Sequence, residues 1–412
     1  MQFGLIGKSL SHSYSAEIHR RIADYDYELL EISENELAQF LKKRDFQGIN
    51  VTIPYKEAVI PFLDGISKTA EKIGAVNTIV NKNGRLFGYN TDFAGMRALF
   101  EHTNISASGK KAAILGTGGT SKTAFAVLKS FSAGEIIFVS RTSKPNSVTY
   151  EELYEKHRNV QIIVNTTPSG MFPNADTAPI SIDGFSRLEG VVDAVYNPLR
   201  TNLVLNARER NIPASGGLYM LAAQAVYACE LFTDTKQDKS KIKEAYEYVK
   251  RQKENIVLIG MPSSGKTTVG KLLSNAICRD FFDSDEEILK IIKMPIREFF
   301  EKYGEEKFRS IEKEVISSLS QKSATVIATG GGAVLDSKNV TALKRNGKMI
   351  FLNRSPENLT PTKDRPLSSE RASLIKMFSA RYPIYKSVAD TVISADGTPQ
   401  SVLDTILKEL SL

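Results

Sequence analysis

The stretch of sequence that most constrains the fold is a glycine-rich loop in the second half of the chain. It reads Gly260-Met261-Pro262-Ser263-Ser264-Gly265-Lys266-Thr267 and fits the phosphate-binding pattern G-x-x-x-x-G-K-[ST]. The apolar run 256–259 predicts a buried strand before the loop, and residues 268–276 predict a helix after it. This order places backbone N–H groups around an anion, aided by the helix dipole. We therefore expect a nucleotide site, with Lys266 on the outer phosphates and Thr267 on Mg²⁺.

The residues upstream of this loop predict a separate unit, because such a loop normally follows the first strand of its domain. The chain has 412 residues, a length that suggests two or three domains. We find no apolar run of about 18 residues and no secretory signal at the start. A cytoplasmic protein without a membrane segment is expected, with Cys229 and Cys278 reduced.

The net charge of +7 raises the question of nucleic acid as a partner. The lysines are dispersed, however, and no nucleic-acid-binding module is recognisable. We therefore expect small phosphorylated and carboxylated molecules as partners, not nucleic acid or membrane. A homo-oligomer is left open.

The first 92 residues alternate short apolar runs with helical patterns, which predicts a mostly parallel α/β sheet. The predicted strands are 3–6, 27–32 and 48–53, and the predicted helices are 16–23 and 34–43. Polar islands interrupt the pattern at 11–15, 50–56, 74–78 and 88–92, each where we expect a strand to end. Ligands bind at that edge of open α/β sheets. Their hydroxyls, amides, lysine and aspartate suit a polyhydroxylated acid, although each island alone also fits a capped turn.

These islands carry a resemblance to a known family. Four motifs, taken in order, resemble shikimate dehydrogenase over about residues 1–250. They are Ser-His-Ser-x-Ser, Asn-Val-Thr-Ile-Pro-Tyr-Lys, Gly-Ala-Val-Asn-Thr and Asn-Thr-Asp-x-x-Gly. The resemblance implies a substrate lobe from residues 1–92 and 218–250 and a Rossmann-like NADP lobe from residues 93–217. It implies Lys56 and Asp92 as the catalytic pair. The implied substrate contacts are Ser13, Ser15, Thr52, Lys56, Asn77, Asp92, Tyr196 and Gln224.

The chemistry agrees with this transfer, because reduction of a ketone by hydride needs a proton for the developing alkoxide. A cationic Lys56 beside an ionised Asp92 can donate that proton or stabilise the charge as it forms. The alternative is a surface lysine and a helix N-cap.

A second glycine loop, residues 116–121, stands between a predicted strand at 111–115 and a predicted helix through Lys129, the context of a dinucleotide site. The next predicted strand ends at Ser140-Arg141-Thr142, with Lys144 close behind. An NAD site usually carries an acid there, so two cations favour the 2′-phosphate of NADPH. The candidate NADP residues are Gly116, Gly118, Gly119, Thr120, Ser121, Ser140, Arg141, Thr142, Lys144 and Gly217. The family pattern is Asn-Arg-Thr, so Ser140 departs from it, and the short stretch 141–165 predicts a more open adenine side.

Residues 234–254 are rich in lysine, yet Ile242, Ala245, Tyr246 and Val249 recur at helical spacing. We expect a last amphipathic helix of the first unit and a very short linker at 251–255.

The residues after the linker resemble shikimate kinase over 255–412. The motifs are Asp-Ser-Asp at 283–285, Gly-Glu-Glu-Lys-Phe-Arg at 304–309, Gly-Gly-Gly at 330–332, Asp-Arg-Pro-Leu at 364–367 and Arg-Tyr-Pro-Ile-Tyr at 381–385. The resemblance implies a P-loop α/β domain with a parallel sheet. The implied ATP contacts are Gly260, Pro262, Ser263, Ser264, Gly265, Lys266, Thr267, Thr268 and Arg365. The implied shikimate contacts are Asp285, Arg309, Gly331, Gly332 and Arg381.

The same resemblance implies a role for each charged residue. Asp285 is the candidate base, and Lys266 and Arg365 stabilise the transferred phosphoryl group. Thr267 and Asp283 hold Mg²⁺, the latter directly or through water. Residues 353–373 are the expected lid, with Arg365 at its tip. As alternatives, Arg309 and Glu312 form a helix ion pair, and Asp283 is an N-cap.

The sequence therefore predicts a bifunctional enzyme of the shikimate pathway that reduces 3-dehydroshikimate with NADPH and phosphorylates shikimate with ATP. One rival is a dehydrogenase acting mainly on quinate with NAD. Another is a protein in which one half is a non-catalytic nucleotide-binding regulatory domain.

Overall fold

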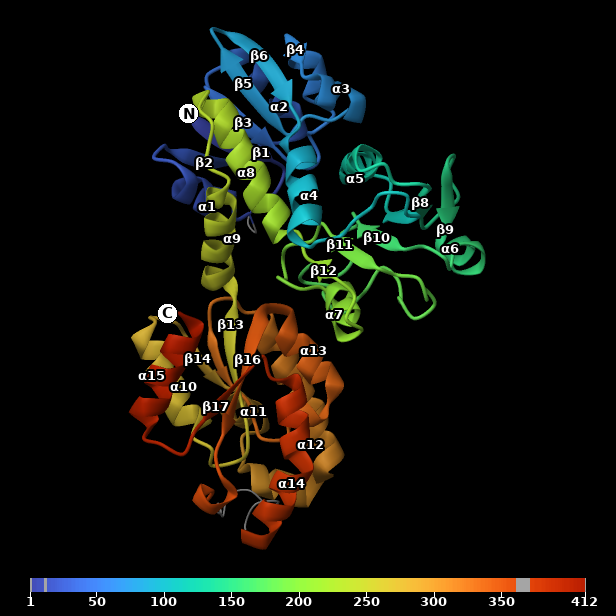
Figure 1. Cartoon of the computed structure of the whole chain (residues 1–412). Coiled ribbons are helices and arrows are strands. Elements are labelled where there is room, and N and C mark those ends of the chain that lie inside the picture. The colour runs from blue at the N-terminus through green and yellow to red at the C-terminus, as the bar shows by residue number, and fades with distance from the viewer. Residues whose placement is uncertain (1, 11–12, 361–370, 412) are drawn as a thin grey trace. The chain divides into compact units, whose positions relative to one another are not determined.

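The computed structural model describes residues 2–10, 13–360 and 371–411 (Figure 1). The chain divides into two compact units, Met1–Lys250 and Arg251–Leu412. Within the described residues, the first unit holds two six-stranded sheets and the second holds one sheet of five strands. None of the helices described is both long enough and apolar enough to cross a membrane.

The first sheet of the first unit is mixed. Its elements are β1 (Phe3–Gly7), α1 (Ser15–Ile22), β2 (Tyr27–Glu31), α2 (Glu34–Lys43), β3 (Gly48–Val51), η1 (Ile60–Phe62), β4 (Gly65–Ile66), α3 (Lys68–Ile73), β5 (Thr78–Lys82) and β6 (Arg85–Tyr89). The strand order is β2-β1-β3-β5-β6-β4. The first three strands pair in parallel, whereas β5 is antiparallel to both β3 and β6.

The second sheet is parallel throughout. Its elements are β7 (Ala112–Leu115), α5 (Gly119–Ser130), β8 (Ile136–Ser140), β9 (Ser147–Thr149), α6 (Tyr150–Lys156), β10 (Ile162–Asn165), β11 (Gly190–Asp193), α7 (Asn202–Glu209) and β12 (Ala214–Ser215). The strand order is β12-β11-β10-β7-β8-β9. From β7 the chain first adds β8 and β9 on one side and then adds β10, β11 and β12 on the other side of β7. Side chains alternate along β7, so Ala113 and Leu115 pack on the core of α6 and α7, while Ala112 and Ile114 pack on the core of α5. Burial on both faces explains the continuous apolar runs of these strands.

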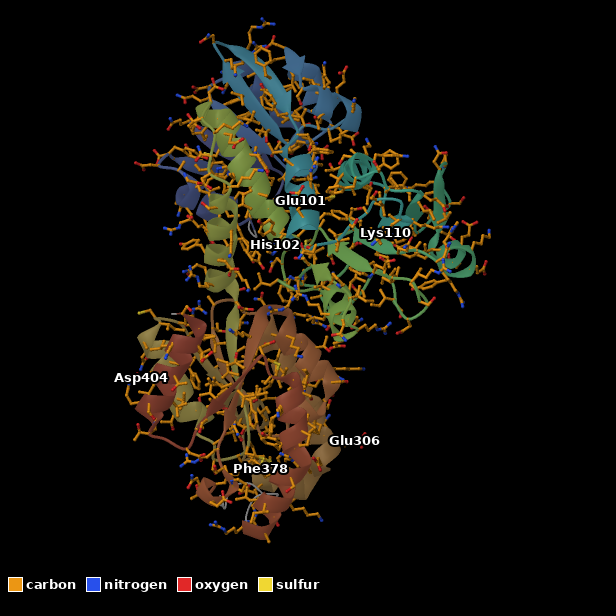
Figure 2. All side chains as sticks on the ribbon, viewed as in Figure 1. Glu101, His102, Lys110, Glu306, Phe378 and Asp404 are labelled. Atoms are coloured by element: carbon orange, nitrogen blue, oxygen red, sulfur yellow. The ribbon has the colours of Figure 1, made fainter. Side chains whose placement is uncertain are left out.

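Three long helices complete the first unit: α4 (Thr91–His102), α8 (Leu218–Thr233) and α9 (Ser240–Lys253), of which the part up to Lys250 belongs to this unit. Helices α4 and α8 run side by side (Figure 1). His102, labelled in Figure 2, is the last residue of α4. Its ring stacks on Tyr219 of α8 at a ring-centroid distance of 3.8 Å. The apolar faces of α8 and α9 pack with Ile18 and Ile22 of α1, so the chain returns to the first sheet after the second.

The second unit is a parallel sheet with helices on both faces. Its elements are β13 (Asn255–Ile259), α10 (Lys266–Ala276), β14 (Phe281–Asp283), α11 (Ser284–Ile292), α12 (Ile296–Ser320), β15 (Val326–Ala328), η2 (Ala333–Leu335), α13 (Ser337–Asn346), β16 (Gly347–Asn353), η3 (Pro356–Asn358), α14 (Arg371–Val388), β17 (Thr391–Ser394) and α15 (Pro399–Leu410). The strand order is β14-β15-β13-β16-β17, with β13 in the centre. Val257 and Ile259 face the core of α11 to α14, and Ile256 and Leu258 face the core of α10 and α15.

The predicted α/β class is confirmed, with differences in detail. The expected strand 48–53 ends at Val51, since the chain turns at Ile53 and Pro54. The expected linker 251–255 is instead the last turn of α9, the single residue Glu254 and the start of β13. The island 74–78 precedes a strand and does not end one. It still reaches the ligand edge, because β5 runs antiparallel and therefore starts where β3 ends.

Candidate active sites

The first site is organised by an ion pair between Lys56 and Asp92. Lys56 lies in the turn after β3, and Asp92 lies in the first turn of α4. The Nζ atom of Lys56 is 2.6 Å from Oδ2 of Asp92, and both side chains are mostly buried. The N-cap of α4 is not Asp92, as one alternative held, but Asn90, whose side chain accepts a hydrogen bond from the Phe93 N–H at 3.1 Å. The Asp92 carboxylate is therefore turned toward the lysine, at a helix end that favours negative charge.

Three amide and hydroxyl side chains meet beside this pair. Asn77 donates from Nδ2 to Oγ1 of Thr91 at 3.0 Å and to Oε1 of Gln224 at 3.4 Å. Its Oδ1 atom accepts from the Thr91 backbone N–H at 2.7 Å. All three side chains are buried. Three segments that are far apart in sequence thus converge next to Lys56 and Asp92. They are the start of β5, the start of α4 and the middle of α8.

Thr91 of this cluster and the adjoining Asn50, which donates to the Asn77 carbonyl oxygen at 3.3 Å, were not among the predicted site residues. Asn50 donates from Nδ2 to Oγ1 of Thr78 at 3.0 Å, and its Oδ1 accepts from the Tyr27 hydroxyl at 2.7 Å. Tyr27 in turn stacks on buried His19 at 3.9 Å. Burial lowers the pKa of His19 to about 3, so this ring is neutral. Both missed residues lie inside quoted motifs, which is the signal that could have found them.

The remaining predicted substrate residues lie at the start of α1 and on two loops. The Ser15 backbone N–H donates to Oγ of Ser13 at 3.2 Å, which fixes the two serines at the helix start. Tyr196 contacts Tyr14, the residue between them, edge to face at 5.4 Å. Thr52 follows β3 directly, in the same turn as Lys56. The structure therefore places Tyr196 against the segment that carries the two serines, and Thr52 in the turn that carries Lys56.

The glycine loop of the second sheet fits a dinucleotide. It lies between β7 and α5, where the strand order reverses, and Gly118 is the N-cap of α5. A Cβ atom at Gly118 or Gly119 would meet nothing within 4 Å, so the backbone there is open to a ligand. Gly116 has φ +108°, which disfavours other residues. At Gly217 a Cβ atom would collide with the carbonyl group of Ala194, so this glycine is needed for close packing.

The predicted cations lie at the end of β8, the strand next to β7. Arg141 and Lys144 are exposed, and Lys144 Nζ lies 3.1 Å from Oγ1 of Thr117 in the glycine loop. Ser140 is buried and Thr142 is exposed. No helix intervenes between β8 and β9, and α6 begins only at Tyr150.

The phosphate loop of the second unit wraps its own lysine. Lys266 donates to the carbonyl oxygens of Gly260 at 3.0 Å and Met261 at 2.7 Å. Gly265 has φ +92° and caps α10, whose first turn carries Thr267 and Thr268. The neighbours Pro262, Ser263 and Ser264 complete the turn, with Ser263 at φ +64°.

The two residues expected at Mg²⁺ contact each other. The Thr267 hydroxyl donates to Oδ2 of Asp283 at 2.6 Å, and Oδ1 of Asp283 accepts from the Asp285 backbone N–H at 2.9 Å. Asp283 is therefore an N-cap, as the alternative held, and also faces the phosphate loop. The described residues contain no group of three metal-ligating acids, histidines or cysteines. The residues present thus fit an ion held by one hydroxyl and one carboxylate together with nucleotide phosphates.

The predicted shikimate residues gather around the glycine turn after β15. A Cβ atom at Gly330 would lie 2.5 Å from Oδ1 of Asp285, and one at Gly332 would collide with the Arg309 guanidinium. Arg381 donates to the carbonyl oxygen of Gly331 at 3.0 Å. One location is therefore lined by the glycine turn together with Asp285, Arg309 and Arg381. It adjoins the phosphate loop, because a Cβ atom at Gly331 would lie 2.8 Å from Pro262.

Two buried residues that support this turn were not predicted as site residues. Glu312 lies 2.8 Å from Arg309, so the helix ion pair given as an alternative is present. Burial raises the pKa of Glu312. The Tyr385 hydroxyl donates to the carbonyl oxygen of Gly331 at 2.5 Å. Arg365 and the centre of the expected lid lie outside the described residues.

The two sites define a dinucleotide-dependent oxidoreductase joined to a P-loop phosphotransferase. Residues 5–79 match the family model of the shikimate dehydrogenase substrate binding domain, and residues 262–411 match that of shikimate kinase. The shikimate dehydrogenase (NADP(+)) of Clostridium perfringens strain 13 is 38% identical over 266 residues, covering 60% of this chain and 98% of that protein.

Solved structures agree over the same region. Shikimate dehydrogenase 1 from Peptoclostridium difficile is 36% identical with a TM-score of 0.56, covering 60% of this chain and 98% of that one. Shikimate 5-dehydrogenase from Thermus thermophilus, solved with NADP(H) and shikimate, is 30% identical with a TM-score of 0.55, covering 60% and 99%. The chain belongs to the shikimate dehydrogenase family. With its C-terminal shikimate kinase domain, it is a bifunctional enzyme of the shikimate pathway.

Proposed function

We propose that Lys56 and Asp92 carry the chemistry of the first site, the reduction of 3-dehydroshikimate to shikimate. The observation that supports this most directly is their 2.6 Å ion pair, which adjoins the Asn77–Thr91–Gln224 cluster. Asp92 holds the Lys56 ammonium group in place, and Lys56 donates a proton to the forming alkoxide or stabilises its charge. NADPH, when bound, supplies the hydride.

The same proposal assigns the remaining polar residues to substrate binding. Asn77 and Gln224 are buried and already hold each other, so they offer fixed donors and acceptors to ring hydroxyls. The full set proposed to contact substrate is Ser13, Ser15, Thr52, Lys56, Asn77, Asp92, Tyr196 and Gln224.

NADPH is the proposed reductant because Arg141 stands where NAD sites carry an acid. The Clostridium perfringens relative is named an NADP(+) enzyme, and the Thermus thermophilus structure was solved with NADP(H). The residues proposed to approach the pyrophosphate and nicotinamide side are Gly116, Gly118, Gly119, Thr120, Ser121 and Gly217. Those proposed to approach the adenosine phosphate are Ser140, Arg141, Thr142 and Lys144.

In the second site we assign the transfer of phosphate from ATP to shikimate. Asp285 accepts the proton of the attacking hydroxyl, while Arg309 and Arg381 bind the carboxylate, for which a guanidinium offers paired donors. Lys266 and Arg365 stabilise the phosphoryl group in transit. Thr267 and Asp283 would hold Mg²⁺, which would offset the negative charge of the nucleotide phosphates.

For domain boundaries we propose residues 1–92 with 218–250, residues 93–217 and residues 255–412. We propose a cytoplasmic location and small-molecule partners, with no nucleic acid or membrane involved.

The deciding experiment assays the full-length chain for each reaction separately. NADPH-dependent reduction of 3-dehydroshikimate and shikimate-dependent ATP turnover should both occur. Faster oxidation of quinate with NAD would favour the quinate alternative. Ligand binding without turnover in one half would favour the regulatory alternative.

A further inference from the structure

An ion pair joins the two sheets of the first unit beside the catalytic lysine. Nζ of Lys122 lies 2.8 Å from Oε1 of Glu57. Glu57 follows Lys56 in the turn after β3, and Lys122 lies in the first turn of α5, directly after the glycine loop. One partner is thus attached to the residues proposed to meet substrate, and the other to the loop proposed to meet the dinucleotide.

The placement of Lys122 is not explained by its own helix. A cation in the first turn opposes the helix dipole, so the intrahelical effect of Lys122 is unfavourable. The structure pairs Lys122 with Glu57 of the other lobe. Helix α3 of the first sheet also contacts α5, so the lobes approach each other at this place through backbone elements as well.

The pair is also exposed, with 43% of the Lys122 side chain and 56% of the Glu57 side chain open to solvent. Exposed ion pairs are weak and screened by salt. Such a contact forms and breaks easily, as a contact must if the lobes part to admit substrate and close again.

We propose that Glu57 and Lys122 are a positioning pair for hydride transfer: their attraction draws the dinucleotide loop toward the Lys56 turn and sets the distance between the two bound reactants. This inference rests on the proposed dehydrogenase function. Neither residue touches a reacting atom; both act through the segments that carry them, and a small displacement of bound reactants changes rate strongly.

The test is a charge reversal in the full-length chain. Glu57→Lys, Lys122→Glu and the double variant are compared with wild type at saturating NADPH, so that altered cofactor affinity does not enter. Glu28→Lys, on an exposed position of the edge strand β2, carries the same charge change away from the lobe contact. The thermal unfolding midpoint of the first unit in each preparation reports that this unit, which carries all the substitutions, is folded.

Each single reversal should lower kcat/KM for 3-dehydroshikimate about fivefold, as expected for an exposed ion pair, and the double variant should recover to within about twofold of wild type. Added NaCl should slow the wild type and the double variant but speed the single variants, because it screens attraction in the former and repulsion in the latter. Glu28→Lys should match wild type.

A double variant no better than the weaker single variant would overturn the proposal. So would a normal Glu57→Lys beside a poor Lys122→Glu, since that pattern describes a direct lysine contact with the dinucleotide. Wild type inactive toward 3-dehydroshikimate would overturn the proposed function and, with it, the role of the pair. A cross-linking experiment reports separately whether the two positions meet. It treats the Glu57→Cys/Lys122→Cys variant with a short bis-maleimide, in a chain whose exposed Cys278 is changed to Ser.

Discussion

The Tyr385 hydroxyl donates a 2.5 Å hydrogen bond to the carbonyl oxygen of Gly331. This carbonyl also accepts from Arg381, one of the proposed shikimate ligands. Tyr385 is fully buried and stacks on Phe351 at 5.0 Å, so its ring is fixed by packing. The bond therefore ties the glycine turn to helix α14 and orients a peptide that we expect to face shikimate.

Tyr385→Phe removes this bond and keeps the ring. We expect kcat/KM for shikimate to fall about fivefold, the effect of a lost hydrogen bond of about 1 kcal/mol, with little change in KM for ATP. The matched control is Tyr382→Phe. Tyr382 stacks on Phe378, the residue labelled in Figure 2, and the variant loses the same hydroxyl nearly one turn away from Tyr385. Equal effects of the two variants, or a loss of stability with normal shikimate kinetics, would contradict the positioning role of Tyr385.

The second prediction concerns the choice of cofactor. Arg141→Ala should raise KM for NADPH at least about tenfold, since charge-assisted hydrogen bonds contribute about 1.5–3 kcal/mol, and should change KM for NADH little. Lys144→Ala should act in the same direction but less, because Lys144 is already engaged with Thr117. Steady-state kinetics with both cofactors decide. Equal use of NADH and NADPH by wild type would remove the basis of the assignment.

The third prediction concerns pH and the buried carboxyl group of Asp193. It accepts hydrogen bonds from Asn165 Nδ2 and the Val195 N–H, both at 2.9 Å, and from the Thr201 hydroxyl at 2.6 Å. Burial nevertheless raises the pKa of Asp193 from 3.8 to about 7. The native state therefore holds this proton more tightly than the unfolded chain does.

A raised native pKa stabilises the fold at low pH, and that contribution disappears as pH rises toward the native value. The free energy of unfolding of wild type, relative to Asp193→Asn, should fall between about pH 4 and pH 7 and level off above. Asparagine can accept from Asn165 and Val195 and donate to Thr201, so the variant should fold. Denaturant unfolding across this range checks the trend. A difference that rises with pH would mean that the three donors outweigh burial.

Much of this architecture follows from local pattern. The phosphate loop, the apolar strands of both parallel sheets and helix α9 were predicted because each depends on residues adjacent in sequence. The antiparallel run of β5, by contrast, depends on pairing with β3, which no local signal reports. The same holds for the cap of α4: Asn90 and Asp92 are equally plausible by residue type, and packing against Lys56 decides between them.

The candidate sites divide in the same way. Some residues named from motifs do lie close together, such as Lys56 with Asp92 and, as the alternative held, Arg309 with Glu312. The support from Asn50, Thr91 and Tyr385 was not foreseen, because their hydrogen bonds join elements that meet only in the folded chain.

The fourth prediction concerns where the second unit begins. Arg279 donates to the carbonyl oxygens of Arg251 and Glu254, and the Ala324 N–H donates to that of Lys253 at 3.1 Å. Buried Asn255 donates to the carbonyl oxygen of Lys322 at 2.7 Å and accepts from Thr325. A fragment of residues 251–412 should therefore fold alone and retain kinase activity.

A fragment of residues 256–412 loses these contacts and should have a lower thermal midpoint, by the equivalent of about 1–3 kcal/mol for buried groups left unpaired. Thermal unfolding and shikimate-dependent ATP turnover of both fragments provide the check. An insoluble 251–412 fragment that regains activity only when residues 1–250 are added would show that the second unit is not independent.

The central claim is that one chain holds two complete and separate sites. The most direct measurement incubates the full-length protein with 3-dehydroshikimate, NADPH, ATP and Mg²⁺ and follows shikimate and shikimate 3-phosphate. Wild type should form shikimate 3-phosphate. Lys56→Ala should form neither product, with reduction lowered at least about 100-fold, yet should phosphorylate added shikimate at the wild-type rate. Lys266→Ala should accumulate shikimate. Unchanged reduction by a folded Lys56→Ala chain, or loss of both activities in either variant, would contradict the account.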